Sequence, residues 1–393
     1  MKPSDFESSR FGRVRYDEER RFYWFDPEPL PTTLELDEET LIALSRADAA
    51  VGRLDGVAQL LANPDLIASP YAAREAVASS RIEGTHATLS EVFETEAGKA
   101  RAFAEDVKTI RAYSSALDTG LAAVADRGLT LDSLKDVHRA LMDGQTHVGK
   151  PGEWRDDAVW VGSPTGGPET ATFVPPIPAR LPELLAEWAN WHSQPPRLPL
   201  LVRVALLHYQ FLTIHPFFDG NGRVGRMLIQ MILEEERALS TPLLYVSAYF
   251  ARNRRQYYDR LQAVRQHGEI QQWLQFFLTA VYEQANDGVT RARGLLELRE
   301  EYRAELSGTR SRATDVVDLL FSNPVVSARR LQAELGVTNQ GALNLLRSLE
   351  QRGILAQAGS AGRGGKNFWY APRILGFFDD EAPDETTDTP TAV

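Results

Sequence analysis

Apolar residues recur at intervals of three and four positions through most of the chain, from about residue 37 to about residue 306. This spacing places them on one face of an amphipathic helix, so the pattern predicts a mostly α-helical protein. Gly84 follows one such segment, where it would end the helix. Thr88 and Glu91 then have the spacing of a capping box at the start of the next helix.

Three segments depart from this helical pattern. Residues 1–36 are polar and contain several prolines, which favours an extended arm. Residues 148–178 are rich in glycine and proline, with β-branched and aromatic residues alternating around Trp160, and this pattern predicts a short β-hairpin or flap. Residues 376–393 carry six acidic residues and no basic residue, so we expect a disordered acidic tail.

Residues 310–373 have the order of a winged helix-turn-helix: three short helical patterns, then two strand-like segments around a glycine-rich tip. This segment contains nine basic and four acidic residues, a net charge of +5. The excess suits contacts with phosphates, so we expect weak binding of duplex DNA, with Arg347, Arg363 and Lys366 as contacts. The alternative is a helix-turn-helix used only for packing or dimerisation.

Composition and charge narrow the function classes. The formal net charge is −11, so the whole chain is not a generic binder of polyanions. There are no cysteines, which excludes disulfides, thiolate metal sites and a cysteine nucleophile. No apolar run approaches the roughly 20 residues of a membrane span, and the N-terminus is polar from the start. The sequence therefore predicts no membrane association and a cytoplasmic location.

The segment TIHPFFDGNGRVGRML, residues 213–228, places a polar, glycine-rich insert between two apolar helical patterns. Glycines and an Asn at the start of a helix leave backbone N–H groups free at its positive end, which makes an anion site. Arg223 and Arg226 are three residues apart on that helix, so both guanidiniums can face one phosphate-bearing ligand. The pattern of a Walker A loop is absent.

Two side chains next to this cradle carry chemistry. His215 can accept a proton at neutral pH, because the unperturbed pKa of histidine is near 6.5. Asp219 offers a hard oxygen ligand for Mg²⁺ beside the phosphates. His208 and His138 lie in apolar helical patterns and are expected to be core residues, and the scattered histidines indicate no zinc site.

At these residues the sequence resembles the Fic family. The family pattern H-x-F-x-[D/E]-G-N-G-R-x-x-R is matched at each fixed position, by His215, Phe217, Asp219, Gly220, Asn221, Gly222, Arg223 and Arg226. The resemblance covers roughly residues 40–290 and implies a helical core with a flap that clamps the target. It also implies the transfer of AMP from ATP to a Tyr, Ser or Thr hydroxyl of a target protein.

The resemblance also implies roles for single residues. His215 would deprotonate the target hydroxyl, Asp219 would bind Mg²⁺, and Phe217 would anchor the loop. Six residues would hold the nucleotide: Gly220, Asn221, Gly222, Arg223, Gly225 and Arg226.

A second motif, SSRIEG at residues 79–84, resembles the inhibitory motif [S/T]-x-x-x-E-[G/N] of the same family through Ser79, Glu83 and Gly84. Its position before the core implies an N-terminal inhibitory helix in the same chain. Glu83 is expected to occupy the γ-phosphate position and pair with Arg226. Ser79 is expected to lie against Asn221, and Gly84 would let the chain leave the crowded site.

The domain organisation predicted from these features has four parts. They are an N-terminal arm and helical region with the inhibitory motif (1–100), a Fic catalytic core (101–290), a linker helix and winged helix (291–375), and the acidic tail (376–393).

The sequence thus predicts an autoinhibited protein adenylyltransferase that uses ATP and Mg²⁺ and can also modify itself. Two alternatives stay open: transfer of another nucleotide or phosphate-bearing group, or removal of AMP, on the same fold, and a transcription regulator. The pattern leaves open whether the chain forms a homodimer.

Overall fold

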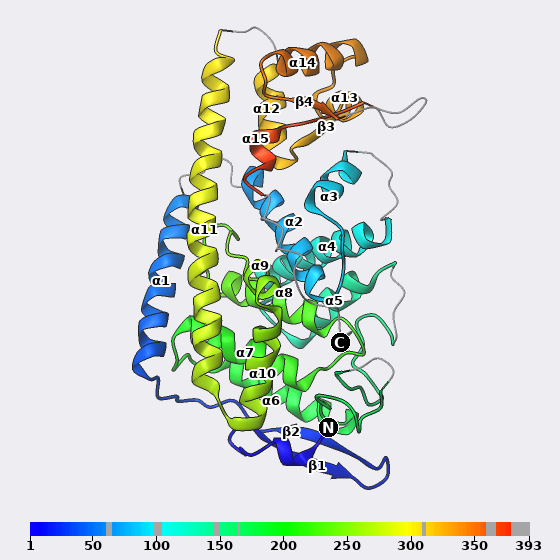
Figure 1. Ribbon diagram of the computed structural model, residues 1–393, viewed down its shortest axis with the longest axis vertical. Helices are drawn as coiled ribbons and strands as arrows, with labels where there is room; N and C mark the ends of the chain where they lie inside the picture. The colour runs from blue at the N-terminus through cyan, green and yellow to red at the C-terminus, as the bar shows by residue number, and fades with distance from the viewer. Residues whose placement is uncertain are drawn as a thin grey trace.

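The structure is a computed structural model that describes residues 1–59, 65–97, 104–144, 149–162, 166–308, 312–358 and 367–378. The molecule is elongated, with a helical body in the middle, a small winged-helix unit at one end and a two-stranded hairpin at the other (Figure 1). The prediction of a mostly helical fold is confirmed. None of the helices in these ranges is long and apolar enough to cross a bilayer.

The helices of the body are α1 (Glu38–Ala58), α2 (Asp65–Ile82), α3 (Leu89–Glu96), α4 (Ala104–Arg127), α5 (Leu131–Met142), α6 (Leu181–Ser193), α7 (Leu200–Ile214), α8 (Asn221–Glu235), α9 (Ser247–Arg252), α10 (Arg254–His267) and α11 (Ile270–Glu305), with short 3₁₀ turns at Pro3–Asp5 and Pro178–Arg180. The longest of them, α11, packs along α1 and reaches the winged-helix unit (Figure 1). One continuous helix therefore joins the body to that unit, and residue 290 lies inside it.

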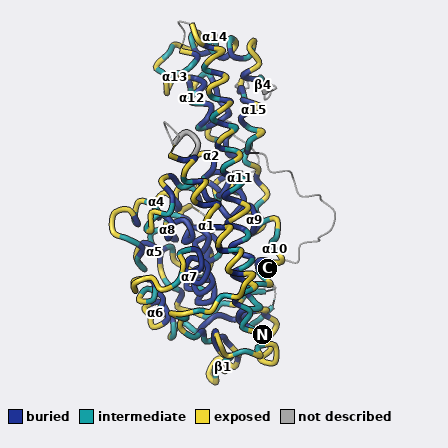
Figure 2. Tube along the Cα trace, turned by 90° about the vertical axis from the view of Figure 1, so that its left-hand side faces the viewer, coloured by how far each residue is buried: buried dark blue, intermediate teal, exposed yellow. Residues whose placement is uncertain are grey.

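Helices α7 and α8 form the centre of the body. Every residue of α7 from Leu201 to Ile214 is buried, and so is every residue of α8 from Arg223 to Leu233. The buried stretches lie in the middle of the body in Figure 2. Each fully buried Leu, Ile or Phe side chain is worth roughly 1.5–3 kcal/mol relative to exposure. The polar loop between these two helices is therefore held at both ends by a strongly stabilised pair.

The start of α3 is fixed by the capping box that the sequence predicts. Thr88 Oγ1 accepts a hydrogen bond from the Glu91 backbone N–H at 3.3 Å, and the Glu91 carboxylate accepts one from the Thr88 N–H at 2.9 Å. Gly84 has a φ of +94°, a conformation that favours glycine, so the chain turns sharply between α2 and α3.

The N-terminal segment is a hairpin rather than an extended arm. Strands β1 (Gly12–Asp17) and β2 (Phe22–Pro27) pair antiparallel across a turn in which the Asp17 carboxylate accepts from the Glu19 and Arg20 N–H groups. The alternation is hard to see in the sequence because the exposed face also carries aromatic residues, Tyr16 and Tyr23, and the turn has no glycine.

The hairpin packs against the segment that the sequence predicts to be a flap. Trp24 and Phe25 are buried beside Phe173 and Val174, and the Phe25 N–H donates to the Val174 carbonyl at 2.9 Å. In the described part of residues 149–178, strand pairing is limited to one bridge, between Val161 and Phe173. The many glycines and prolines explain why no longer ladder forms there.

The C-terminal unit is a winged helix-turn-helix, as predicted. Its helices are α12 (Ala313–Ser322), α13 (Ala328–Leu335), α14 (Asn339–Gln351) and α15 (Pro372–Leu375), and its strands β3 (Val325–Ser327), β4 (Ala356–Ala358) and β5 (Phe368–Tyr370) form an antiparallel sheet in the order β3-β5-β4. Arg347 is exposed on α14. The other two expected DNA contacts, Arg363 and Lys366, and the acidic tail from residue 379 lie outside the described residues.

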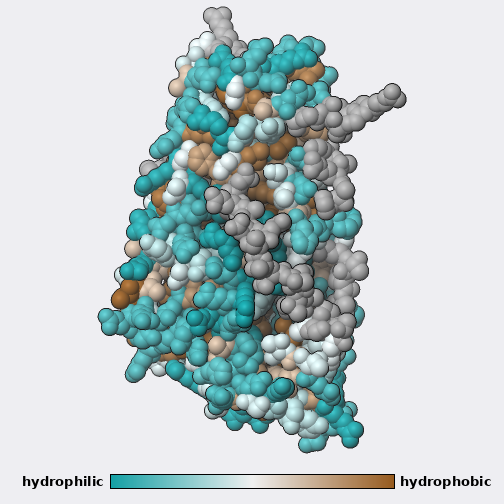
Figure 3. All heavy atoms as spheres, in the orientation of Figure 1, coloured by the Kyte–Doolittle hydropathy of each residue, from teal (hydrophilic) through white to brown (hydrophobic). Residues whose placement is uncertain are grey.

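The winged-helix unit packs directly on α2 and α3. An apolar cluster across this junction joins Ala73 of α2, Phe93 of α3 and Phe368 of β5. Asn323 adds a hydrogen bond to the Glu96 carboxylate at 2.9 Å. The face shown in Figure 3 is mostly hydrophilic, and hydrophobic atoms gather around this junction in its upper part. The two units are thus joined by packing as well as by the chain.

Candidate active site

The polar loop between α7 and α8 makes two tight turns. His215 caps the C-terminus of α7 with φ 53° and ψ 59°, and Gly220 caps the N-terminus of α8 with φ 77°. Both are left-handed conformations, which are uncommon for a residue other than glycine. A Cβ atom on Gly220 would also lie 3.3 Å from Leu141 and Met142, so glycine is required there by conformation and by space.

Asn221 and Phe217 fix the shape of this loop. The Asn221 side chain accepts from the Phe217 N–H at 2.9 Å and donates to the Phe217 carbonyl at 2.8 Å. The Phe217 ring is fully buried, stacked on His138 at 3.8 Å between ring centroids and packed against Trp154 at 4.8 Å. Phe217 therefore anchors the loop in the core.

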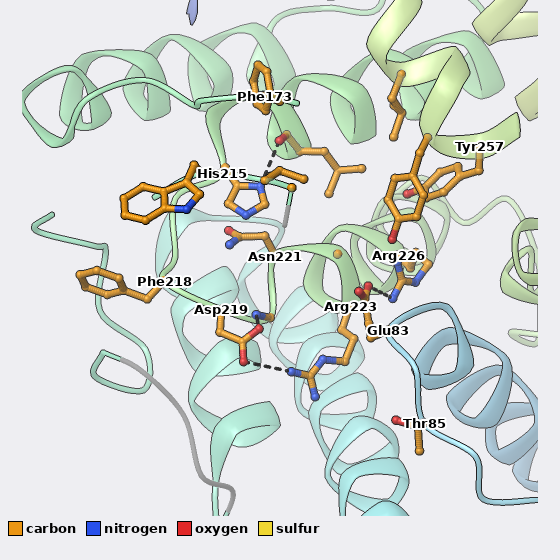
Figure 4. A pocket seen from close by; sticks show the side chains of 18 of the residues that line it. Glu83, Thr85, Phe173, His215, Phe218, Asp219, Asn221, Arg223, Arg226 and Tyr257 are labelled. Atoms are coloured by element: carbon orange, nitrogen blue, oxygen red, sulfur yellow. Dashed lines mark hydrogen bonds and ion pairs between the residues drawn. The ribbon is translucent and has the colours of Figure 1, made fainter. Parts of the chain in front are cut away.

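The loop borders a cavity of about 570 Å³, drawn in Figure 4. Its lining residues come from five parts of the chain: Leu212, His215, Phe218, Asp219, Gly220, Asn221, Gly222, Arg223 and Arg226 from the end of α7, the loop and α8; Glu83 and Thr85 after α2; Thr109 from α4; Trp160, Val161, Gly162 and Phe173 from the flap; and Tyr257, Tyr258, Leu261 and Arg265 from α10. The motif residues and Glu83 are thus brought together. Gly225 instead faces Leu212, where a Cβ atom would come within 2.9 Å, so it allows α7 and α8 to pack closely.

His215 is a neutral imidazole at the edge of this cavity. Its Nδ1 lies 3.3 Å from the Leu212 carbonyl, which assigns the proton to Nδ1 and leaves Nε2 as an acceptor. Burial lowers the pKa of His215 to about 3, and the positive charges of Arg155 and Arg265 act in the same direction. The imidazole is therefore neutral at physiological pH, with Nε2 unprotonated.

Arg226 lies at the opposite side of the cavity and bonds to two residues of the SSRIEG motif, Ser79 and Glu83. Its Nε donates to Ser79 Oγ at 2.7 Å, and one terminal nitrogen donates to the Ser79 carbonyl at 3.0 Å. The same terminal nitrogen donates to the Glu83 carboxylate at 2.7 Å (Figure 4). Burial opposes the charge of Arg226, but the carboxylate of Glu83 overrides this and raises its pKa above the ordinary value. Ser79 therefore contacts Arg226, whereas the sequence favoured a position against Asn221.

The Glu83 carboxylate fills the space above the first turn of α8. A Cβ atom on Gly222 would lie 2.4 Å from Glu83 Oε1 and 3.1 Å from the second terminal nitrogen of Arg226. That nitrogen is buried and has no hydrogen-bond partner within the described part of the chain. The space beside the Glu83 carboxylate is therefore bordered by Gly222, by the N-terminus of α8 and by the Arg226 nitrogen that has no partner among the described residues. These groups favour the binding of an anion there.

Arg223 and Asp219 complete the loop side. The Asp219 carboxylate accepts from the Gly220 N–H at 2.6 Å and lies 3.8 Å from the Arg223 guanidinium. The Asp219 side chain is 55% exposed, so one oxygen is accessible from the cavity. Among the described residues, no group of three or more His, Asp or Glu side chains converges on one point. A divalent cation held here would take a single carboxylate from the chain.

His208 and His138 are core residues, as the sequence predicts. His208 is fully buried and bonded to the Gly225 carbonyl at 2.7 Å and the Tyr257 hydroxyl at 2.9 Å. His138 accepts from the Gly152 N–H at 2.8 Å and contacts the Asp219 carbonyl at 3.2 Å. His138 thereby supports the loop from below without reaching the cavity lining.

Sequence reasoning missed the contribution of α10. Tyr257, Leu261 and Arg265 line the cavity from one face of this helix, at four-residue spacing that is visible in the sequence. It also missed Glu75 of α2, a buried carboxylate that accepts from the Ser247 N–H at 3.1 Å and the Tyr113 hydroxyl at 3.2 Å. No local pattern signals that role, because its partners lie on α9 and α4.

Comparison with protein families matches two consecutive regions of the chain. Residues 41–122 match the Fic/DOC family N-terminal region and residues 128–233 match the Fic/DOC family. Residues 314–364 match an HTH DNA-binding domain, which agrees with the winged-helix unit described above.

Curated relatives match part of the chain. A protein adenylyltransferase Fic from Nematostella vectensis is 31% identical over 150 residues, 38% of this chain and 31% of the relative. One of the same name from Drosophila grimshawi is 30% identical over 207 residues, 50% of this chain and 38% of the relative. The chain therefore spans about a third of the length of these relatives.

Two solved structures support the fold. A Fic family protein from Desulfovibrio desulfuricans superimposes with a TM-score of 0.57 at 20% identity, covering 86% of this chain and 97% of the other. A Fic domain-containing signalling protein from Bacteroides thetaiotaomicron gives a TM-score of 0.50 at 19% identity, covering 63% and 98%. The matched regions, the motif and the fold together show that residues 41–233 of this chain carry the Fic/DOC N-terminal and Fic/DOC family regions.

Proposed function

We propose that this protein is an adenylyltransferase that moves AMP from ATP to a hydroxyl side chain of a protein. The observation that carries the proposal is that a neutral histidine, His215, and an anion site at the start of α8 line the same cavity. The curated relatives are named protein adenylyltransferases, which supports the same reaction class.

The phosphates of ATP would lie over the first turn of α8. The first backbone N–H groups of a helix have no partner inside it, and they point at an anion at the helix start. Gly220 and Gly222 allow the phosphates to approach the backbone. Arg223 and the terminal nitrogen of Arg226 that has no hydrogen-bond partner among the described residues would add positive charge on either side. Asn221 would act mainly by holding the loop in shape, since both ends of its amide are bonded to Phe217.

Asp219 fits Mg²⁺ in the manner expected at a nucleotide site. Mg²⁺ is commonly bound by one or two carboxylates together with substrate phosphates and waters, and Asp219 offers one exposed carboxylate beside the cradle. The ion would supply neutralisation of the phosphate charge. The position of Asp219 is set by its bond to the Gly220 N–H.

In the transfer step, His215 Nε2 accepts the proton of the target hydroxyl as its oxygen attacks the α-phosphorus. The bond between the α-phosphorus and the bridging oxygen breaks, and pyrophosphate leaves. The flap residues Trp160 and Val161 line the same cavity, so the target segment would lie between them and His215. Catalysis would come mostly from positioning and charge stabilisation.

Glu83 would inhibit this reaction by holding Arg226. Its carboxylate lies against Gly222 and Arg226, so it occupies the place where a terminal phosphate would bind. Two anions in this space repel each other, and a displaced γ-phosphate would misalign the α-phosphate for attack. A misplacement of about 1 Å can cost about 10²-fold in rate. The wild-type protein would therefore be nearly inactive.

Incubation of the purified protein and a cell lysate with ATP labelled at either the α- or the γ-phosphate tests the reaction class. Label from the α-position alone, in a protein-bound AMP adduct found by mass spectrometry, supports the proposal. Label from the γ-position alone indicates phosphate transfer, and loss of AMP from an added AMP-bearing protein indicates the reverse reaction. The assay should use the Glu83→Gly variant, which is expected to give the strongest signal, and His215→Ala is its negative control.

A second candidate function is DNA binding by the winged-helix unit. The observation that favours it is the match of residues 314–364 to an HTH DNA-binding domain, together with the exposed Arg347 on α14. Fluorescence anisotropy with duplex DNA at low and high salt tests it. Binding that is present at low salt and falls steeply as salt rises is the expected result.

A further inference from the structure

Arg155 is a buried cation that the proposed reaction leaves without a role. Its side chain lies at the junction of the flap and the His215 loop, and the residue is only 2% exposed. Its Nε donates to the His215 carbonyl at 2.8 Å, and its terminal nitrogens donate to the carbonyls of Asp157 at 3.0 Å, Ile214 at 3.5 Å and Pro176. A buried charge that is held by carbonyls alone is expensive, so a specific reason for keeping it is expected.

One end of this network supports the catalytic histidine. Because α7 ends at Ile214, the carbonyls of its last turn have no partner inside the helix. Arg155 donates to two of them, Ile214 and His215, and its own backbone N–H donates to the Pro216 carbonyl at 2.9 Å. Arg155 therefore binds the backbone on both sides of the left-handed turn at His215.

The other end holds the flap. Asp157 and Pro176 lie on the two arms of residues 149–178, on either side of the single bridge between Val161 and Phe173. One planar guanidinium therefore bonds to both arms and to the loop at the same time. Lysine could replace the charge but not this fork of donors.

The charge of Arg155 also acts on the imidazole. The charged groups around His215 are Arg155, Arg265 from α10, and Asp219, whose carboxylate is bonded to Gly220 N–H and lies near Arg223. Arg265 is itself held over the Phe173 ring at 3.9 Å. After burial, Arg155 is the next cause that lowers the pKa of His215.

We propose that Arg155 is a positioning residue for the transfer reaction: its guanidinium fixes the His215 backbone in register with the flap, so that the imidazole meets the target hydroxyl. This inference rests on the proposed function. It predicts that Arg155 affects the transfer rate and the state of the imidazole but has little effect on nucleotide affinity, because the anion site is built from α8.

The test compares Arg155→Lys and Arg155→Met in the Glu83→Gly background. Both variants should lower the transfer rate at saturating ATP by about 10²-fold, while KM for ATP changes by less than about threefold. The acidic limb of the pH profile should move to higher pH in Arg155→Met, because a neighbouring positive charge is lost, and stay in place in Arg155→Lys. Arg203→Met is the matched control: Arg203 is also buried and bonds the His192 carbonyl, but it lies near the other end of α7.

A second readout does not depend on activity. ¹⁵N NMR of histidine should show His215 as a single Nδ1–H tautomer in the parent and in Arg203→Met, and as a mixture in both Arg155 variants. Retention of more than half of the parent rate by Arg155→Met, an equal loss in Arg203→Met, or an unchanged tautomer overturns the inference. If the Glu83→Gly parent transfers no AMP, the proposed function fails, and the tautomer alone decides whether Arg155 positions His215.

Discussion

The proposed reaction needs a neutral His215 and a charged Arg226, and burial disfavours the charged form of both residues. For His215 this burial suits the proposed reaction, in which the neutral imidazole would act as the base, and the charges of Arg155 and Arg265 also favour the neutral form. For Arg226 burial is opposed by the Glu83 carboxylate, which keeps the guanidinium charged. The same cavity can therefore hold a neutral base and a charged anion site.

The pH dependence of transfer follows from the lowered pKa of His215. We expect the rate of Glu83→Gly at saturating ATP to stay constant as the pH falls from 8 through the ordinary histidine value of about 6.5. The base is lost only when the imidazole is protonated, and its pKa of about 3 places that well below pH 6. Initial rates of AMP incorporation between pH 8 and 5 measure this. A rate that halves near pH 6.5 would indicate an ordinary imidazole and contradict the account.

Ser79 should contribute to inhibition, and Ser80 should not. Ser79→Ala removes the acceptor of Arg226 Nε, while the Ser79 carbonyl and Glu83 remain. The net contribution of a hydrogen bond is about 0.5–1.5 kcal/mol, so we expect a rise in transfer rate of about two- to tenfold. Ser80 is also buried, but its hydroxyl has no hydrogen-bond partner in the described structure, so Ser80→Ala is a matched control. Equal effects of the two substitutions would assign the change to helix packing.

The residues of the site were predictable where they lie close together in the sequence. His215, Asp219 and Arg226 belong to one loop and one helix start, so spacing alone places them together. Arg155 and Arg265 reach the same place from separate segments, and only the packing of flap and α10 around the loop reveals them. The expected contact between Ser79 and Asn221 was wrong because the Asn221 amide is hydrogen-bonded to the Phe217 backbone, and no sequence pattern shows that bond.

At the scale of elements, α2 connects three parts of the molecule. After its C-terminus, Glu83 enters the site, where Arg254 Nε also donates to the Ile82 carbonyl at 2.7 Å. In its middle, Glu75 is bonded to Ser247 of α9 and Tyr113 of α4. Nearer its start, Ala73 packs under the winged-helix unit. Movement of Glu83 out of the site is therefore resisted along much of the helix.

Loosening the junction with the winged-helix unit should weaken inhibition. Phe368→Ala removes a buried ring from the cluster that contacts α2 and α3, and such a truncation costs about 3–5 kcal/mol. We expect at least about a threefold rise in transfer rate and faster hydrogen exchange in α2. Leu346→Ala is the control, because it removes a buried side chain of α14 from the same unit but from a different apolar cluster. If both variants leave the rate unchanged, packing of the winged-helix unit on α2 does not contribute to inhibition.

The elements were predictable where one periodicity dominates. The helices of the body and the winged-helix order follow from apolar spacing and from end signals such as Thr88 and Gly84. The hairpin at residues 12–27 was not predicted, because both of its faces carry aromatic residues and the alternation of polar and apolar positions is therefore weak. Residues 148–178 were expected to form a short hairpin or flap, and their described part pairs at one bridge and is otherwise held by contacts such as those of Arg155.

At the scale of the whole molecule, charge is unevenly distributed. The chain carries −11 in total, while the segment 310–373 carries +5, so contacts with a polyanion would be confined to the winged-helix end. Helix α14 lies at that end, away from the candidate active site (Figure 1). The sequence predicts this segregation of charge, but only the three-dimensional structure shows that the unit packs on α2.

Arg347→Ala in the full-length protein tests the DNA interaction. Loss of one phosphate contact should weaken duplex binding at low salt and lower the slope of log affinity against log salt by about one. Glu334→Gln, an exposed acidic residue on α13, is the control and should leave the slope unchanged or strengthen binding. Absence of salt-dependent binding by the wild-type protein would instead favour a protein-interaction role for the unit.

The most direct test of the central claim is the rate of AMP incorporation in three proteins measured side by side with ATP and Mg²⁺: the wild type, Glu83→Gly, and Glu83→Gly combined with His215→Ala. We predict that Glu83→Gly acquires or transfers AMP at least about tenfold faster than the wild type, because Arg226 and the start of α8 become free for the terminal phosphate. Loss of the base should then reduce the rate by about 10²–10⁴-fold in the double variant, with nucleotide binding retained. A Glu83→Gly protein no faster than the wild type, or a double variant as active as Glu83→Gly, would contradict the account.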